Sequence, residues 1–407
     1  MIPFAPPRID QAIIDEVTAT LKTGWITTGP RTKLFEKKLT EFCGNKATIC
    51  LNSATAGLEI MLRWFGVGEG DEVILPAYTY AATANVVIHC GAIPVLVDVG
   101  ADFNMDCNLL KKAVSSRTKV IMPVDFGGYP CDYHVIMKLV AAPEINSLFT
   151  AANENQEKLG RIMVLSDAAH SFGATYKGKR TGQLADVSVF SFHAVKNLTT
   201  AEGGAVALNL PAPFDNTEIY NYLCVYTLHG QNKDALSKMQ KGNWKYDVVM
   251  AGYKCNMTDI AAAIGLVELS RYENDMLVKR KHICDSYNSF FNKFNWAQLP
   301  PSGESTIATS FHLYPLRIKG ITEPMRDAVI QKIFDKDVSV NVHFIPLPLL
   351  TFYRNMGMNM SEYPVSYDNY SREISLPVFY GLTDIQLSTV CEAVSKSVDE
   401  ILAVKST

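Results

Sequence analysis

Seven short apolar runs, separated by turns and helical patterns, limit most strongly what residues 46–210 can fold into. The runs are "ATICLN" (47–52), "DEVILP" (71–76), "IPVLVDV" (93–99), "TKVIMPV" (118–124), "RIMVLSD" (161–167), "VSVFSF" (187–192) and "GAVALN" (204–209). Several are almost continuously apolar, which is typical of strands covered on both faces. Helical patterns at 54–65 and 81–90 lie between some of them. This alternation predicts an α/β fold with a mainly parallel central sheet and layers of helices.

The pattern changes in the last third of the chain. The stretch 253–291 predicts a long helix, which ends at a break, "NWAQLPPSGES". The elements expected after the break are a strand (310–318), a helix (323–334), a strand (339–344) and a closing helix (384–404). Because 407 residues exceed one core of usual size, we expect a large domain over 1–265, with an N-terminal arm, and a smaller α+β domain over 266–407.

Composition excludes several classes of protein. The 38 basic and 41 acidic side chains give a net charge of −3, which does not suit a nucleic-acid or membrane surface. No apolar run approaches the roughly 20 residues that span a bilayer, and the start lacks a signal-peptide pattern. The nine cysteines lie singly, without the paired spacing of a zinc site, so we expect reduced thiols and no metal. We therefore expect a cytoplasmic protein with no nucleic-acid or membrane partner.

A single lysine, Lys196, follows the run 187–192 and is surrounded by small and polar residues. Such a lysine is either a solvated turn residue or a nucleophile held in a pocket. A nucleophilic lysine needs a pocket that keeps its amine deprotonated, and an electron-withdrawing cofactor, of which pyridoxal phosphate is the commonest. That cofactor requires a carboxylate for its ring nitrogen and a cup for its phosphate.

Both requirements have candidates in the sequence. Asp167 ends the run 161–167, at the strand end where ligands collect in open α/β sheets, 29 residues before Lys196. Asn52 and Ser53 are N-cap types before a helical pattern, whose first N–H groups and positive dipole end suit an anion. Ser191 adds a hydroxyl donor. Each signal is weak alone, because a strand-end Asp is most often a cap or turn residue.

Taken together, motifs along essentially the whole chain resemble the sugar aminotransferases of the DegT/StrS family, which use pyridoxal phosphate. The motifs are "GWITTGP" (24–30), "NSATAGLE" (52–59), "GEGDEVILPAYTY" (68–80), "SDAAHSFGA" (166–174), "FSFHAVKNLTTAEGG" (190–204), "GYKCNMTDIAAAIGL" (252–266) and "NVHFIP" (341–346). Within the family they look nearest to the enzyme that makes the amino-arabinose nucleotide sugar for lipid A modification. The resemblance implies a type I aspartate-aminotransferase-like fold.

The resemblance also implies roles for individual residues. Lys196 would hold the cofactor and move a proton between cofactor and substrate, and Asp167 would keep the ring nitrogen protonated. His170 would lie near the phenolic oxygen and Tyr80 would stack on the ring; by residue type alone, a core histidine and a core tyrosine would be favoured. The phosphate would be bound by Ser53, Ala54, Thr55 and Ser191.

Further implied residues lie outside this set. Asn256 aligns with a segment that reaches the neighbouring subunit's site in relatives, so the resemblance implies a homodimer with shared active sites. By residue type alone, Asn256 is an N-cap of the helix that follows. Trp25, Thr28 and His343 fall in segments near the sugar nucleotide; by type they are a packed aromatic, a loop hydroxyl and a strand histidine.

The expected activity is transfer of an amino group, from glutamate, onto a nucleotide-linked keto sugar at C4, with C3 as the alternative. Its rivals are a regulatory protein that keeps the pocket without turnover, and the family's dehydratase branch, which replaces the lysine with histidine.

Two departures from the family stand out. The segment 141–160 is long and polar, a surface excursion that could reshape the site entrance, and "SDAAH" lacks the acidic residue that often precedes Asp167.

Overall fold

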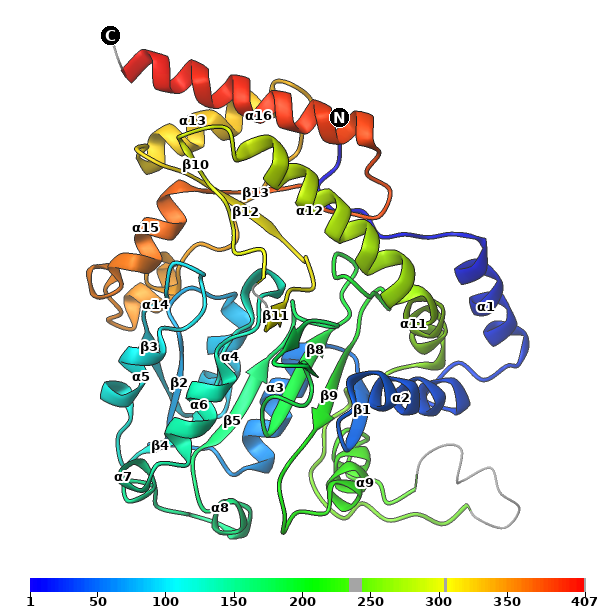
Figure 1. Cartoon of the computed structure of the whole chain (residues 1–407). Helices are drawn as coiled ribbons and strands as arrows, with labels where there is room; N and C mark the ends of the chain where they lie inside the picture. Colours follow the sequence, from blue (N-terminus) through cyan, green and yellow to red (C-terminus); the bar gives the residue numbers. More distant parts are fainter. Residues whose placement is uncertain (234–243, 304–305, 406–407) are drawn as a thin grey trace.

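The computed structural model describes the chain except residues 234–243, 304–305 and 406–407 (Figure 1). All seven predicted runs form one sheet, in the order β1–β9–β8–β5–β4–β2–β3. Its strands are β1 (Ala47–Leu51), β2 (Glu72–Pro76), β3 (Ile93–Val97), β4 (Thr118–Ile121), β5 (Met163–Asp167), β8 (Val187–Ser191) and β9 (Gly204–Leu208). Within this sheet β9 runs antiparallel to both its neighbours, and the other pairings are parallel. The mainly parallel α/β fold is confirmed.

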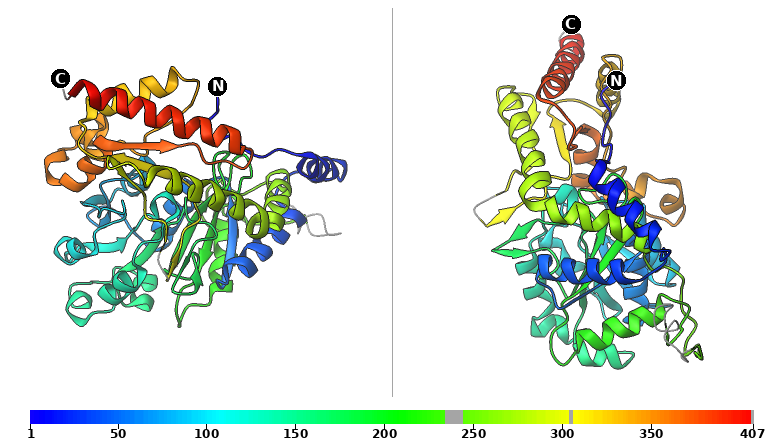
Figure 2. Two further views of the ribbon diagram at one scale, coloured as in Figure 1. Left: turned by 45° about the horizontal axis from the view of Figure 1, so that its top comes forward. Right: turned by 90° about the vertical axis from the view of Figure 1, so that its right-hand side faces the viewer.

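Helices cover both faces of this sheet (Figures 1 and 2). One face packs on α3 (Ala54–Trp64), α4 (Ala81–His89) and α9 (Asn216–Tyr226), and the other on α2 (Pro30–Cys43), α5 (Cys107–Ala113), α6 (Tyr133–Val140) and α11 (Asp259–Arg271). Alternate strand residues point to opposite cores: Val73 and Leu75 of β2 join the first, whereas Ile74 joins the second. Burial on both faces explains why these strands are continuously apolar.

Helix α3 packs unusually close to the sheet because residue 57 is glycine. A Cβ at Gly57 would lie 2.8 Å from Cγ1 of Val189 and 3.0 Å from Cγ2 of Val206. Those two valines belong to β8 and β9. The close approach fixes the height of the α3 N-terminus relative to the end of β8, and both are parts of the site described below.

The C-terminal part contains a three-stranded antiparallel sheet, β10–β12–β13, with its own core. Its elements are β10 (Ala297–Gln298), β12 (Tyr314–Ile318), β13 (Glu373–Leu376), α12 (Leu277–Phe291), α13 (Glu323–Phe334), α14 (Thr351–Asn355), α15 (Pro364–Arg372) and α16 (Asp384–Lys405). A small third sheet holds β6 (Thr175–Tyr176), β7 (Lys179–Arg180) and β11 (Ile307–Ala308). The separate core favours two domains, but the division at 265/266 stays a prediction; that position lies within α11.

The N-terminal segment links the two parts. Ile2 forms a bridge with Val338 in the C-terminal part, and the chain then runs across to α1 (Gln11–Lys22), as Figures 1 and 2 show. Arg8 is held on the way by Asp275, at 2.6 Å, and by the ring of Tyr380. None of the helices among the described residues has the length and apolar character needed to cross a membrane.

Two predicted elements differ from the structure. The long helix of 253–291 is two helices, α11 and α12, joined by a π-helical turn at Tyr272–Met276. The predicted strand 339–344 is wrong, because this segment makes only an isolated bridge from Asn341 to Ser375, and the backbone N–H of His343 donates to the Glu373 carboxylate instead of a ladder carbonyl. The third strand of the small sheet is β13, which the sequence did not reveal.

The segment 141–160 contains two short helices, α7 (Pro143–Asn146) and α8 (Glu154–Leu159). Its side-chain amides cap the C-terminus of α3: Asn155 donates to the carbonyl of Trp64, and Asn153 and Gln156 donate to that of Phe65. It lies at the end of the sheet away from the C-terminal part (Figure 1). The expectation that it could reshape the site entrance is therefore wrong.

Candidate active site

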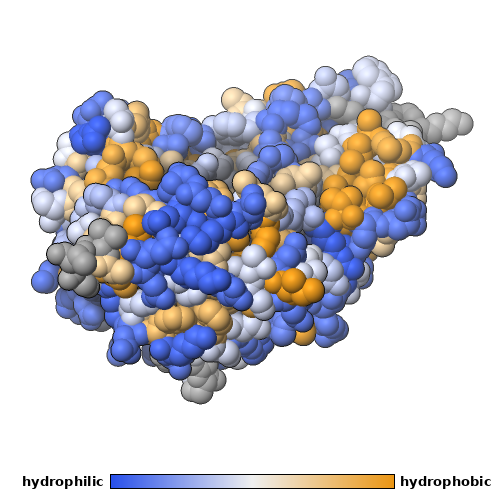
Figure 3. All heavy atoms as spheres, turned by 90° about the horizontal axis from the view of Figure 1, so that it is seen from above, coloured by the Kyte–Doolittle hydropathy of each residue, from blue (hydrophilic) through white to orange (hydrophobic). Residues whose placement is uncertain are grey.

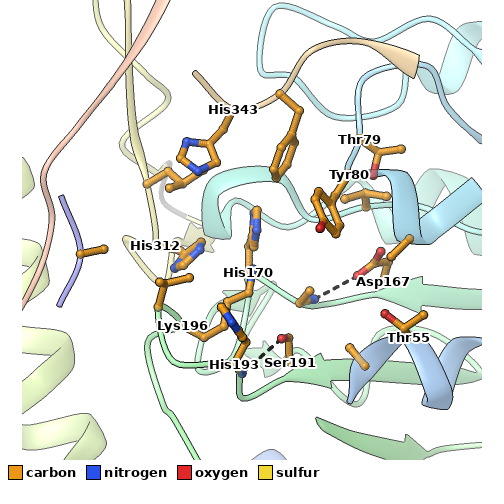
Figure 4. A pocket seen from close by; sticks show the side chains of 18 of the residues that line it. Thr55, Thr79, Tyr80, Asp167, His170, Ser191, His193, Lys196, His312 and His343 are labelled. Carbon is orange, nitrogen blue, oxygen red and sulfur yellow. Dashed lines mark hydrogen bonds between the residues drawn. The ribbon is translucent and has the colours of Figure 1, made fainter. Parts of the chain in front are cut away.

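A cavity of about 370 Å³ lies where the carboxyl ends of the sheet strands meet the C-terminal part (Figure 4). Nine of the twelve residues predicted for the site line it: Ser53, Ala54, Thr55, Tyr80, Asp167, His170, Ser191, Lys196 and His343. They come from separate segments of the chain, which the fold brings together. The remaining three, Trp25, Thr28 and Asn256, do not line it.

Asp167 ends β5 with its carboxylate almost fully buried at one side of the cavity. Thr83, on α4, donates its hydroxyl to Oδ2 at 2.8 Å, and the backbone N–H of Ala169 donates to Oδ1 at 3.2 Å. Burial raises the pKa of Asp167, whereas these two hydrogen bonds and the charge of Lys196 lower it. A buried carboxylate in this setting favours a cationic N–H partner.

Lys196 lies in the loop between β8 and β9, in a turn closed by the bond from its own N–H to the carbonyl of His193. Burial lowers the pKa of its amine to about 8, although Asp167 opposes the shift. The next residue, Asn197, anchors the loop by donating to the carbonyl of Ser310 at 2.7 Å. A buried lysine with a lowered pKa, held in an anchored loop, suits a nucleophile rather than a solvated turn residue.

His170 is buried and forms one wall of the cavity. The backbone N–H of Gly127 donates to its Nδ1 at 3.3 Å, so the neutral ring carries its proton on Nε2. Burial lowers the pKa of His170 well below its ordinary value, and the charge of Lys196 adds to this. The ring is therefore neutral, and its one donor is Nε2.

The N-terminus of α3 presents free backbone N–H groups at the other side. Ser53 is its N-cap, accepting from the N–H of Ala56 at 3.1 Å, as predicted. The N–H of Gly57 bonds the carbonyl of Ser53, which leaves those of Ala54 and Thr55 for an anion. β9 touches this turn: a Cβ at Gly204 would lie 2.4 Å from the nitrogen of Ala54.

His312, which sequence reasoning missed, forms a pair with His170. His312 lines the cavity with its ring centroid 4.3 Å from that of His170. Because the amide nitrogen of Asn197 donates to Ser310, its oxygen accepts from Nδ1 of His312, at 2.7 Å. His312 therefore has Nε2 as an acceptor. The sequence places it in a predicted strand, with no spacing that connects it to Lys196.

Further aromatic side chains line the cavity, among which Tyr80 was predicted from the sequence. Tyr80 precedes α4 and is 63% exposed, with its ring 5.7 Å from that of Phe344. An exposed ring beside Asp167 is open to stack on a ligand, and it is not the core tyrosine that residue type alone favours. Phe4 and His193 also line the cavity and were not predicted.

The three residues outside the cavity lie near one another. Asn256 donates its amide to the hydroxyl of Thr28 at 2.5 Å, and the indole N–H of Trp25 donates to the carbonyl of Thr28 at 3.1 Å. The N-cap of α11 is Thr258, which accepts from Ala261, so the interpretation of Asn256 as this cap is wrong.

These residues fit pyridoxal phosphate. The free N–H groups at α3 and the hydroxyl of Ser191 suit the phosphate, the Asp167 carboxylate suits the ring nitrogen, and Lys196 suits the carbonyl carbon. When bound, the cofactor supplies the electron-withdrawing ring that makes amino-group transfer possible. Asp167 would hold the positive charge on the ring, and Lys196 would carry the proton between carbon atoms.

The chain belongs to the DegT/DnrJ/EryC1/StrS aminotransferase family, whose model matches residues 7–395. It is 37% identical to MJ1066 of Methanocaldococcus jannaschii, an uncharacterised protein, over 98% of both chains. It is 35% identical to the spore coat polysaccharide biosynthesis protein SpsC of Bacillus subtilis, over 97% of this chain and 96% of SpsC.

Solved structures are similar over almost the whole chain. Spr1654 of Streptococcus pneumoniae, assigned as a sugar aminotransferase, has a TM-score of 0.94 in its PMP form, with 45% identity over 98% of this chain and 100% of that one. PseC of Helicobacter pylori, an aminotransferase of pseudoaminic acid biosynthesis, has a TM-score of 0.85 and 27% identity, over 98% of this chain and 99% of PseC. The resemblance found in the sequence is thus confirmed: this is a pyridoxal-phosphate aminotransferase, and the regulatory alternative is disfavoured.

Asp167→Asn tests the ring-nitrogen partner. The amide cannot stabilise a protonated ring nitrogen, and loss of a charged hydrogen bond of this kind costs roughly 1.5–3 kcal/mol. We therefore expect the turnover rate to fall by at least about tenfold while the fold is retained. Steady-state kinetics on the cofactor-loaded enzyme would measure this, and turnover near that of the wild type would make Asp167 a structural residue.

Proposed function

We propose that this chain transfers an amino group from glutamate to C4 of a nucleotide-linked keto sugar, in the biosynthesis of an amino sugar or surface polysaccharide. The observation that carries this is the Asp167–Lys196 pair in one cavity of a family aminotransferase. The names of Spr1654, SpsC and PseC support sugar chemistry, because each refers to a sugar, a polysaccharide or pseudoaminic acid. The choice of C4 rests on the sequence resemblance, with C3 as its alternative.

The chemistry of the cavity supports a polyhydroxylated substrate. Four histidines line it, together with three formally charged side chains: His170, His193, His312, His343, Asp167, Lys196 and Glu202. Imidazole rings offer directed donors and acceptors that suit hydroxyl groups. No arginine is among the described lining residues. The negative charges of a nucleotide diphosphate or of glutamate therefore need cations from outside this cavity.

We infer that the chain forms a homodimer in which each subunit contributes residues to its partner's cavity. Four apolar side chains in and around α1 and α2 are between 45% and 52% exposed: Ile14, Leu21, Ile26 and Leu34. From above, an apolar patch lies toward the side of the molecule that carries α1 (Figure 3). Exposed apolar surface of this kind suits burial against a second copy. Trp25 and Thr28 are close to Ile26 in the sequence, and Asn256 donates a hydrogen bond to Thr28. These three residues would then serve the partner's cavity.

A substrate panel tests the proposed reaction. The cofactor-loaded enzyme is incubated with glutamate and nucleotide-linked sugars that carry a keto group at C3 or C4, and the product is identified by mass spectrometry and NMR. We expect a 4-amino sugar. Amination at C3 would support the alternative regiochemistry, and an enzyme that accepts glutamate but aminates none of the sugars would contradict the proposed function.

Subunit mixing tests the shared site. In a two-fold dimer, Lys196 would act within its own cavity and Asn256 within its partner's. Mixing Lys196→Ala chains with impaired Asn256→Ala chains then places both lesions in one site of each heterodimer and leaves the second site intact. We expect up to half of the wild-type sites in heterodimers to be active. Verified heterodimers without activity, or a fully active monomer, would contradict a shared site.

A further inference from the structure

His343 is held at the cavity wall from three directions. Its backbone N–H donates to Oε2 of Glu373 at 3.1 Å, and its carbonyl accepts from the hydroxyl of Tyr78 at 2.6 Å. Its ring stacks on that of Phe4, with centroids 5.4 Å apart and planes at 23°. Figure 4 shows the ring at the cavity, on the side opposite Asp167. So many contacts fix both the backbone and the ring plane of this residue.

The imidazole of His343 is hydrogen-bonded to a buried relay, which consists of Ser375 and Glu373. Nδ1 of His343 lies 2.9 Å from Oγ of Ser375, and that hydroxyl donates to Oε1 of Glu373. Ser375 and Glu373 are on β13, both completely buried, and neither lines the cavity. Among the described residues, none bonds Nε2 of His343. The relay therefore occupies Nδ1 of His343 and leaves Nε2 for a ligand.

The state of Glu373 sets the direction of the relay. Burial raises the pKa of Glu373 to about 8, while Ser375, the His343 N–H, Arg326 and Arg317 lower it. With the carboxylate ionised, Ser375 donates to it and His343 donates from Nδ1, so Nε2 is an acceptor. With the carboxyl protonated, the hydrogen bonds reverse and Nε2 is a donor. Nδ1 is occupied in both states, and burial lowers the pKa of His343 to about 3, so the ring is neutral.

We propose that Ser375 and Glu373 are positioning residues for sugar recognition: through them, Nε2 of His343 forms a hydrogen bond with a hydroxyl group of the substrate. This inference rests on the proposed function and goes beyond it, because it assigns a task to two buried residues of β13. Both half-reactions would take place at the cofactor that Lys196 holds, and the relay is not among the groups that hold Asp167 or Lys196. Glutamate, unlike the sugar, has no hydroxyl group that Nε2 of His343 could bind. The sugar step should therefore depend on the relay, and the glutamate step should not.

The two half-reactions are measured separately on cofactor-loaded enzyme, by following the cofactor absorbance with glutamate alone and then with the keto-sugar nucleotide alone. Ser375→Thr and Ser375→Val are a matched pair, because their side chains have the same shape and strand preference and differ in one hydroxyl group. We expect Ser375→Val to lower kcat/KM of the sugar step about tenfold relative to Ser375→Thr, mainly through KM. Both variants should react with glutamate at equal rates.

If the threonine and valine variants do not fold, Ser375→Ala and Glu373→Gln are measured in their place. We expect each to lower kcat/KM of the sugar step and to leave the glutamate step unchanged. Ser371→Ala is the control, since the hydroxyl of Ser371 bonds only the carbonyl of Asp368 among the described residues. An active enzyme whose sugar step is equal in the threonine and valine variants contradicts this inference alone. An equal loss in both half-reactions also contradicts it, because it indicates a structural role. Failure of the wild-type enzyme to aminate any keto sugar contradicts the proposed function and this inference together.

Discussion

The site depends on one electrostatic arrangement, a buried carboxylate and an amine of lowered pKa facing one cavity. Asp167 is buried, yet two hydrogen bonds and the nearby amine of Lys196 favour its charged form. The same burial lowers the pKa of Lys196 to about 8, because a charged amine is costly to desolvate. Burial at the cavity thus shifts the pKa of both residues. Their positions, at the end of β5 and after β8, are neighbouring strand ends of one sheet.

The scaffold holds this cavity through close packing and short hydrogen bonds. Gly57 brings α3 against β8 and β9, and the segment 141–160 caps the far end of the same helix. On the opposite wall, the Gly127 loop holds His170 and the Asn197 side chain holds His312. Both imidazoles are neutral with defined tautomers. The site can therefore offer directed hydrogen bonds without adding charge beside the amine of Lys196, which must lose its proton to react.

The sequence was most informative where burial repeats over several residues. Continuous apolar runs predicted all seven strands of the large sheet. Residue types at a strand end, at a helix start and after a strand indicated Asp167, Ser53 and Lys196, which all line the cavity. It was least informative where one contact decides the conformation. The segment 339–344 has a strand pattern, but the N–H of His343 bonds a carboxylate, and the ladder ends there. His312 and Ser375 act through partners far away in sequence, so no local spacing indicates them. The polar segment 141–160 caps a helix through amides whose targets only the fold reveals.

The central claim is that Lys196 is the residue that holds the cofactor. Reduction of the pyridoxal-phosphate-loaded protein with borohydride, followed by peptide mapping, tests this most directly. We expect loss of the visible absorbance and a reduced cofactor attached to Lys196, with no label in Lys196→Ala. A label on another lysine, or a protein that takes up no cofactor, would contradict the account.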